Sequence, residues 1–333
     1  MTLDFVGTVR ERARAKRRKL VFPEGDEARI QAAVAAAVPA GLFDAVLIGA
    51  PDGIVSGLEA AGLHPDAVEI RDVEDPARLE RYRADFVAAR EAARRSARKA
   101  EELVRDPLLQ GALMVRAGEA AASVAGCSRT TGDVVVAALR GVGTAPGIET
   151  VSSSFYMAFD DDHPMGPSVL TFTDAAVVPS PTAVQLAEIG AAAAEARRRI
   201  VGDEPRVAFL SYSTKGSASG PLVELVQEAV ERFRVLMPDV EADGELQGDA
   251  ALSARVADRK APGSPVAGRA NVLVFPDLDA ANIAYKLVQY LGGAQAIGPI
   301  LQGIARPCND LSRGATPDDI VAVACVTSLL AGA

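Results

Sequence analysis

The densest set of reactive side chains lies near the C-terminus, in residues 298–331, GPILQGIARPCNDLSRGATPDDIVAVACVTSLLA. Thr316 and Asp319 have the spacing of a helix start with a capping box. Ser312 and Arg313 come just before it. A hydroxyl, a guanidinium and a carboxylate on one loop could also serve acyl transfer to a thiol, which needs a base for the thiol proton and donors for a phosphate or an oxyanion. From spacing alone, a plain cap and a reactive loop both stay open.

A second candidate is the Ser- and Gly-rich stretch SYSTKGSASGP, residues 211–221, which follows a predicted strand and opens a predicted helix. Backbone N–H groups at such a helix start can hold an anion. The candidate binding residues are Ser213, Thr214, Lys215 and Gly216. The stretch lacks the G-x-x-x-x-G-K-[ST] spacing of a Walker A motif. An ordinary strand-to-helix loop is the alternative.

A third candidate is GCSRTTGDVVVAAL, residues 126–139. Thr130 and Asp133 have the spacing of a capping box. Arg129 lies just ahead of that cap, where a cation and the helix N-terminus can face a phosphate together. We include Arg129, Thr130 and Thr131 as candidate phosphate- or substrate-binding residues.

Composition limits the classes of partner. The chain has 333 residues and a net charge of −9, with 49% hydrophobic and 24% charged residues. These values are ordinary for a globular protein, and the length suggests two domains. The acidic balance argues against nucleic acid as a partner. A site for phosphorylated ligands would have to concentrate positive charge locally.

Histidine is scarce. The two histidines, His64 and His163, lie far apart in turn-like sequences, so neither a histidine-based zinc site nor a Ser-His-Asp triad is expected. The acidic run at 160–162 could hold a cation, although a solvated loop is the favoured interpretation. We therefore predict no metal.

The cysteines and the chain start bear on the compartment. Cys127, Cys308 and Cys325 form no C-x-x-C pair, and their odd number gives no disulfide framework, which favours a reducing compartment. The N-terminal stretch lacks an apolar signal region, and no run of about 18 apolar residues is present. We expect a cytoplasmic protein without a membrane partner.

Short apolar runs alternate with helical patterns along the chain. The predicted strands are 19–23, 45–49, 122–126, 207–213 and 271–276. Helical patterns include 27–38 and 221–233, and the basic stretch 81–105 is predicted to form one long helix with a solvated face. The alternation predicts βαβ units and mostly parallel sheets, in which ligands bind at the carboxyl edge of the strands.

Five segments together closely resemble the phosphate acetyltransferase (phosphotransacetylase) family. They are VFPEGDEARIQAA, SYSTKGSASGP, DGELQGDAAL, KAPGSPVAGRANVLVFPDLDAANIAYK and GPILQGIARPCNDLSRGATPDDIV. They occur in this order over nearly the whole chain. The related phosphate butyryltransferases look similar in fold, but DGELQGDAAL and NDLSRG fit the acetyl enzymes better.

The resemblance implies an α/β fold like that of the isocitrate and isopropylmalate dehydrogenases, with two α/β domains flanking a cleft and mostly parallel sheets. The first domain would combine residues 1–145 with 297–333, and the second would be the inserted 146–296. The implied activity is reversible transfer of an acetyl group between acetyl phosphate and coenzyme A, with inorganic phosphate as the other product. Family members are typically homodimers and use no metal or prosthetic group, coenzyme A being a substrate.

The resemblance also implies residue roles. Asp319 would take the coenzyme A thiol proton, Ser312 would position the thiol or acyl group, and Arg313 would bind phosphate. Arg90 would help to hold the anionic substrates. The thiolate would attack the acetyl carbonyl directly in a ternary complex, so that no cysteine need be a nucleophile.

One position departs from the family pattern. The family usually carries an arginine two helical turns past a His-Thr-Thr or His-Ser-Ser loop, and here that position is Val136. The histidine is replaced as well, by Arg129. We hypothesise that Arg129 has taken over the missing anion contact, with a solvent-facing Arg129 as the alternative.

Three other functions remain to be weighed. One is a phosphate acyltransferase with a longer acyl preference, of the butyryl type. Another is a non-catalytic homologue that binds acyl-CoA or promotes oligomerisation. The third is an NADP-dependent decarboxylating dehydrogenase, which would need a metal-binding carboxylate cluster that these segments do not supply.

Overall fold

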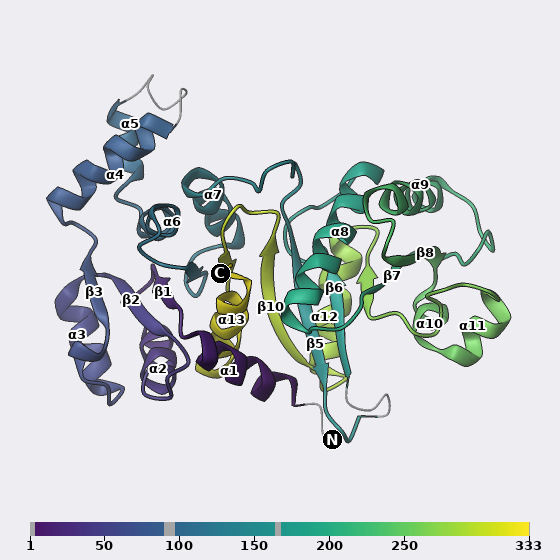
Figure 1. The fold of residues 1–333 in the computed structure, drawn as a ribbon, viewed down its shortest axis with the longest axis horizontal. Coiled ribbons are helices and arrows are strands. Elements are labelled where there is room, and N and C mark those ends of the chain that lie inside the picture. The colour runs from purple at the N-terminus through teal and green to yellow at the C-terminus, as the bar shows by residue number, and fades with distance from the viewer. Residues whose placement is uncertain (1–3, 90–96, 164–167, 333) are drawn as a thin grey trace. The chain divides into compact units, whose positions relative to one another are not determined.

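A computed structural model of the chain describes residues 4–89, 97–163 and 168–332 (Figure 1). By their internal contacts the residues divide into two compact units. One unit, called here the discontinuous unit, consists of Val6–Pro146 and Ile304–Ala333. The other, called the inserted unit, consists of Gly147–Gly303 together with the chain start through Phe5. Both units are α/β, which confirms the predicted fold class.

The discontinuous unit is built on five strands. They are β1 (Lys19–Phe22), β2 (Asp44–Gly49), β3 (Glu69–Asp72), β4 (Ala122–Ala125) and β11 (Cys308–Asp310). Its helices are α1 (Phe5–Lys16), α2 (Ala28–Ala37), α3 (Pro51–Ala60), the 3₁₀ turn η1 (Pro65–Ala67), α4 (Pro76–Ala89), α5 (Ala97–Leu103), α6 (Pro107–Ala117), α7 (Thr131–Gly141) and α13 (Pro317–Leu330).

The five strands form one parallel sheet in the order β11-β4-β1-β2-β3. Helices α2, α3 and α13 pack along one face, and α6 and α7 pack on each other along the other (Figure 1). Because helices cover both faces, β1, β2 and β4 are short, mostly apolar runs, as in the fully buried ASVA of β4. The order changes direction between β1 and β4, and such a switch point is where open parallel sheets bind ligands. The loops after β1, β4 and β11 therefore meet at one edge of the sheet.

The inserted unit has a six-stranded sheet. Its strands are β5 (Ser152–Phe159), β6 (Ser168–Thr173), β7 (Arg206–Leu210), β8 (Glu241–Leu246), β9 (Val272–Val274) and β10 (Gln295–Gln302). Its helices are α8 (Ala183–Ile200), α9 (Pro221–Leu236), α10 (Gly248–Leu252), α11 (Ala254–Lys260) and α12 (Leu278–Tyr290). The order is β10-β5-β6-β9-β7-β8, with antiparallel pairs at the β10 and β5 end and parallel pairs elsewhere.

Successive residues of β9 show how this sheet is buried. Val272 and Val274 pack in a core with α8 and α9, whereas Leu273 packs in a second core with α12. Alternate side chains of a strand point to opposite faces. Both faces of the sheet are therefore covered.

Two expectations from the sequence need correction. The strand β10, Gln295–Gln302, pairs with β5 inside the inserted unit, so the boundary lies at 303/304 rather than at 296/297. The basic stretch 81–105 is not one long helix in its described parts. It contributes to α4 and α5, and these two helices contact each other, which distant segments of one straight helix cannot do.

No helix among the described residues combines the length and apolar character needed to cross a bilayer.

The buried Arg197 of α8 links three parts of the inserted unit. Its side chain is 2% exposed. Nε and Nη2 donate to Asp203 at 2.8 Å each, and Nη1 donates to Thr171 Oγ1 at 3.0 Å and to the carbonyl of Asn271 at 2.9 Å. One guanidinium thus joins the end of α8 to β6 and to the residue before β9.

We predict that Arg197→Met lowers the free energy of unfolding by about 3 kcal/mol, since it leaves buried acceptors without a donor. Arg198→Met is the matched control, because Arg198 pairs with a largely exposed Glu204 and should contribute less than about 1 kcal/mol. Urea unfolding followed by circular dichroism measures both. Equal losses in the two variants would contradict the assigned role of Arg197.

Candidate active site

The loop between β11 and α13 carries Ser312 and Arg313, and the first turn of α13 carries Asp319, the third residue predicted to do chemistry. Ser312, Arg313 and Gly314 are exposed, and Ser312 Oγ accepts a hydrogen bond from the Gly314 N–H at 3.3 Å. The predicted capping box is confirmed: the N–H and the hydroxyl of Thr316 donate to Asp319 Oδ2 at 2.9 and 2.7 Å. Both hydrogen bonds use the same carboxylate oxygen. The box therefore orients the half-buried Asp319 and leaves Oδ1 for another proton or donor.

Arg29, near the start of α2, holds this loop in place through hydrogen bonds to its carbonyl groups. Its Nη1 donates to the carbonyl of Arg313 at 2.7 Å and to that of Ala315 at 3.2 Å. Its Nη2 donates to the carbonyl of Cys127 at 2.9 Å. Nε donates to Glu27 at 2.9 Å, and hydrogen bonds from Arg29 and then Ser128 lower the pKa of Glu27 to about 2. One guanidinium thus ties the loop after β11 to the loop after β4.

Glu24, directly after β1, holds the loop that follows β4. Its Oε2 accepts hydrogen bonds from the N–H groups of Gly126 at 2.6 Å and Cys127 at 2.8 Å. Its Oε1 accepts hydrogen bonds from those of Ser128 at 2.8 Å and Arg129 at 2.9 Å. Four successive backbone donors in the loop between β4 and α7 form an anion-binding nest. A side-chain carboxylate of the protein fills it, so these four N–H groups are not open to a phosphate.

The guanidinium of Arg129 is held by two carboxylates. Nη2 lies 3.2 Å from Asp106 Oδ2, and Nε lies 3.5 Å from Asp133 Oδ2. The alternative of a purely solvent-facing Arg129 is therefore not what the structure has. A role in anion binding would require Arg129 to exchange one of these partners. Val136, which stands on α7 where the family usually has an arginine, is 42% exposed.

The remaining candidates of this unit differ in their surroundings. Thr130 caps α7 in a second box with Asp133, as predicted. Thr131 is half-buried and its hydroxyl donates to Asp310 Oδ2 at 2.6 Å, which connects α7 to the end of β11. Arg90 lies outside the described residues.

Residues 213–216, the candidate loop of the inserted unit, are hydrogen-bonded to residues at the end of β8. The hydroxyl of Ser213 and the N–H of Gly216 both donate to Glu245 Oε1 at 2.8 Å. The hydroxyl of Thr214 accepts a hydrogen bond from the N–H of Gln247 at 2.9 Å. These internal partners satisfy the groups that were predicted to cradle an anion.

Lys215 in the same loop is also engaged. Its ammonium pairs with Asp243, a carboxylate that is 3% exposed, and Arg234 approaches the same carboxylate at 3.2 Å. Burial would raise the pKa of Asp243, but hydrogen bonds from Lys215 and Ser264 hold it below its ordinary value. The loop and the 312–319 segment belong to different units.

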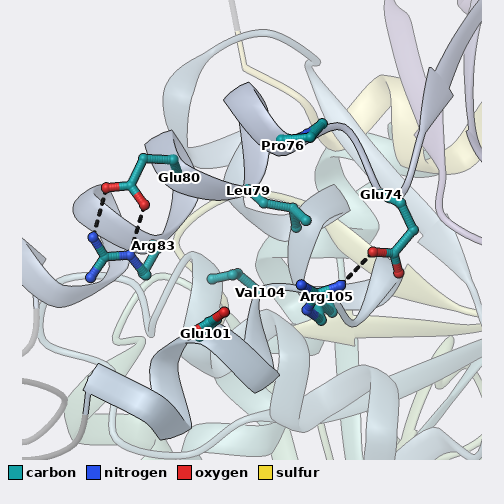
Figure 2. A pocket seen from close by; sticks show the side chains of 8 residues that line it. All are labelled: Glu74, Pro76, Leu79, Glu80, Arg83, Glu101, Val104 and Arg105. Atoms are coloured by element: carbon teal, nitrogen blue, oxygen red, sulfur yellow. Dashed lines mark hydrogen bonds and ion pairs between the residues drawn. The ribbon is translucent and has the colours of Figure 1, made fainter.

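A pocket of about 400 Å³ is lined by residues of α4, of α5 and of the segments next to them (Figure 2). Its charged groups pair with one another: Arg83 with Glu80 at 2.6 Å, and Arg105 with Glu74. None of the predicted site residues that the structure describes lines it. We therefore locate the candidate site at the sheet edge and not in this pocket.

No cluster of three His, Cys, Asp or Glu residues suited to a metal ion occurs in residues 4–89, 97–163 and 168–332. His64 is exposed at the start of η1.

Sequence reasoning missed Glu24 and Arg29. Both lie in EGDEAR, directly after a predicted strand, where polar side chains reach the carboxyl edge of the sheet. That placement was the available signal. It could not reveal their partners, which lie about 100 and 280 residues further along the chain.

Comparison with known proteins agrees with this arrangement. The model of a family described as phosphate acetyl/butaryl transferase matches residues 4–328. A phosphate acetyltransferase of Thermoanaerobacterium thermosaccharolyticum is 45% identical over 329 residues, covering 99% of this chain and 100% of the relative. A phosphate acetyltransferase of Clostridium acetobutylicum is 42% identical over 98% of each chain.

The fold agrees as well. The crystal structure of a phosphotransacetylase from Streptococcus pyogenes superposes with a TM-score of 0.92 at 38% identity, covering 99% of both chains. An acyltransferase is therefore the class that the fold and the site define. The chain belongs to the phosphate acetyl/butaryl transferase family, among relatives named phosphate acetyltransferase.

We predict that Arg29→Lys lowers kcat by about 10- to 100-fold, with a smaller change in KM. A lysine keeps the charge but cannot fork between carbonyls, and displacement of a reactive loop by about 1 Å can cost 100-fold. Initial rates of thioester formation, followed by absorbance, measure this. Arg14→Lys is the control, since Arg14 also donates to a surface carbonyl, that of Ala40. Wild-type kcat in Arg29→Lys would show that the tie is dispensable.

Proposed function

We propose that this chain catalyses the reversible reaction of acetyl-CoA with inorganic phosphate to give acetyl phosphate and coenzyme A. Its full-length relation to phosphate acetyltransferases carries the proposal. Ser312 and Arg313 on the loop before α13, and Asp319 in its first turn, support it. The enzyme is a transferase with phosphate acetyltransferase activity, and neither a butyryl-type preference nor a non-catalytic role is favoured. Production of acetyl-CoA from acetyl phosphate and coenzyme A, without added nucleotide, tests it directly.

In the proposed mechanism both substrates are bound together. The Asp319 carboxylate takes the thiol proton of coenzyme A, and the thiolate attacks the acetyl carbonyl. The new C–S bond forms as the C–O bond to phosphate breaks, and the proton can leave with the released phosphate. Arg313 binds the phosphate through its forked guanidinium, and Ser312 positions the thiol or acyl group. The capping box supports the role of Asp319 because it fixes the carboxylate in one orientation.

The cysteines support direct transfer. Cys127, Cys308 and Cys325 are buried, and burial raises the pKa of each thiol to about 12. A thiol with such a pKa carries almost no thiolate at neutral pH, so it is a poor nucleophile. We propose no acyl-enzyme and no metal or prosthetic group. The cytoplasm is the proposed compartment, because the three thiols are unpaired.

The remaining candidates are proposed to hold the anionic parts of the substrates. Arg90 and Arg129 would supply charge, and the threonines Thr130 and Thr131 would supply hydroxyl donors. For Arg129, binding would replace the contact with Asp106 or Asp133. Residues 213–216 are proposed to bind coenzyme A. The hydroxyls of Ser213 and Thr214, the ammonium of Lys215 and the N–H of Gly216 have partners within the protein, so binding would replace some of these contacts.

A homodimer is also proposed, and one helix face supports it. Ile283, Leu287, Tyr290 and Leu291 on α12 and just after it are between 52% and 82% exposed. They recur at helical spacing, so they form one apolar stripe. Exposed apolar patches are common at contacts between chains, so this stripe supports the proposal.

We predict that Asp319→Asn lowers kcat by about 100- to 10,000-fold with little change in KM, because a general base acts in the transition state. Asp133→Asn is the matched control: Asp133 occupies the same position in the capping box of α7. Both variants should lose about 1 kcal/mol of stability as weakened caps. If the two variants retain similar kcat, Asp319 is a cap and not the base.

We predict that Leu287→Asp shifts the enzyme from a dimer toward the 34.5 kDa monomer in sedimentation velocity, because a buried unpaired charge opposes association. Val235→Asp changes an equally apolar, exposed position on α9 and should leave the dimer intact. A wild-type protein that sediments as a monomer at micromolar concentration would refute the dimer, and an unchanged Leu287→Asp dimer would place the interface elsewhere.

A further inference from the structure

Asp310, the last residue of β11, is a buried carboxyl group beside the candidate site that the proposed mechanism does not use. The residue is 0% exposed. Oδ2 accepts the hydrogen bond from the Thr131 hydroxyl at 2.6 Å. No residue in the described part of the chain donates to the buried Oδ1 in good geometry. A buried oxygen without a donor is costly, so its retention calls for an explanation.

The backbone around Asp310 is shaped to admit this side chain. Gly126, which follows β4, has φ +108°, and a Cβ there would lie 2.1 Å from Asp310 Oδ1. Only glycine both adopts this conformation readily and leaves the space. The side chain is thus enclosed between the loop after β4 and the start of α7, two residues ahead of Ser312.

Few charged groups act on Asp310. From the loop after β1, Glu24 opposes its ionisation, and from its own loop Arg313 favours ionisation. From α7 it meets the neutral hydroxyl of Thr131. Burial is the largest effect, and it raises the pKa of Asp310 to about 7 against the weaker effects of the hydrogen bonds from Thr131 and the Leu311 N–H.

We propose that Asp310 is a positioning residue that controls the direction of the Thr131 hydroxyl, so that Thr131 donates a hydrogen bond to the phosphate of the substrate only when Asp310 is protonated. The inference rests on the proposed function and deepens it, because it assigns a pH-dependent step in phosphate binding to the same site.

The two states differ by one proton on Asp310 and by the direction of the Thr131 hydroxyl hydrogen. Protonated Asp310 donates its own proton to Thr131 Oγ1, and the hydroxyl hydrogen of Thr131 is then directed to a phosphate oxygen. When the carboxyl group loses its proton to solvent, the Thr131 hydroxyl turns to donate to Oδ2. The phosphate then loses a donor and faces an added negative charge. No covalent bond to carbon, phosphorus or sulfur changes in this switch.

This linkage predicts the pH dependence of substrate binding. If only the protonated form binds well, the competent fraction falls from about nine-tenths to about one-tenth between pH 6 and pH 8. KM for acetyl phosphate should then rise about tenfold over that range. Asp310→Asn cannot ionise and keeps a donor toward Thr131, so its KM should stay low at both pH values.

The experiment measures KM for acetyl phosphate at pH 6, 7 and 8. The variants are Asp310→Asn, Thr131→Val and Thr131→Ser. Ratios of variant to wild type at each pH cancel the titration of the substrate itself. Thr131→Val should have a high KM at every pH, and Thr131→Ser should keep the wild-type profile. Thr327→Val is the matched control. It removes a buried hydroxyl of α13 that accepts a hydrogen bond from the side chain of Asn309, the residue before Asp310, and that has no carboxyl partner among the described residues. This variant should keep the wild-type slope of KM against pH.

A second readout needs no activity. The folded-state pKa of Asp310 lies above the ordinary value of 3.8, so the folded protein holds a proton that the unfolded chain releases, and stability is lost as the pH rises from about 4 through 7. The melting temperature of Asp310→Asn should therefore gain on that of the wild type between pH 5 and pH 8. Thr327→Val should show no such trend.

The outcomes separate the two hypotheses. Absence of acetyl-CoA formation by the wild type would refute the proposed function, while the melting temperatures would still report on Asp310. Normal activity with the same KM slope in Asp310→Asn and wild type would overturn the positioning role. If Asp310→Asn fails to fold, a wild-type slope retained in Thr131→Val would overturn it equally.

Discussion

The candidate site depends on the hydrogen bonds that the carboxylate of Glu24 accepts. Three parallel strands end side by side at one edge, and the backbone that leaves them has donors and acceptors that the sheet no longer satisfies. Glu24 accepts hydrogen bonds from four of the donors after β4. Arg29 donates hydrogen bonds to carbonyl groups in the loop after β4 and in the loop after β11. Together with the hydrogen bond between Thr131 and Asp310, these two side chains set the separation of the segments bearing Thr131 and Ser312. Glu24 and Arg29 of the EGDEAR segment therefore act as structural parts of the sheet edge, and they position the loops that carry the candidate site residues.

This arrangement also answers the question raised by the net charge of −9. Several carboxylates of the protein are turned inward: Glu24 onto backbone N–H groups, Glu245 onto the 213–216 loop, and Asp243 onto Lys215 and Arg234. Their charge is matched locally and adds little to the field at the surface. A formal charge counted from the sequence thus overstates the repulsion that an anionic substrate would meet. The same pairing limits which donors are left for that substrate.

The sequence predicted what depends on local pattern. The strands from 19 to 23 and from 122 to 126 were recognisable because helices cover both faces of the sheet and leave only apolar residues. The capping boxes at Thr130 and Thr316 follow from a spacing of three residues. Contacts between distant segments were not predictable. Nothing local shows that Glu24 fills the donors at 126–129, that Glu245 closes the 213–216 loop, or that β10 belongs with β5. In each case the contact is made by a partner that is distant in the sequence.

The discontinuous unit has a consequence for how the protein is made. Its edge strand β11, the buried helix α13 and the Ser-Arg-Gly loop all come from the last thirty residues, after the inserted unit has been passed. During synthesis the inserted unit can fold as soon as it leaves the ribosome, whereas residues 6–146 must wait for a strand and a core helix that follow the inserted unit in the sequence. The sheet is completed and the reactive loop is supplied in the same late event. A chain released early would therefore be unfinished in structure and in chemistry together, and would leave the edge of β4 open to pairing with other chains.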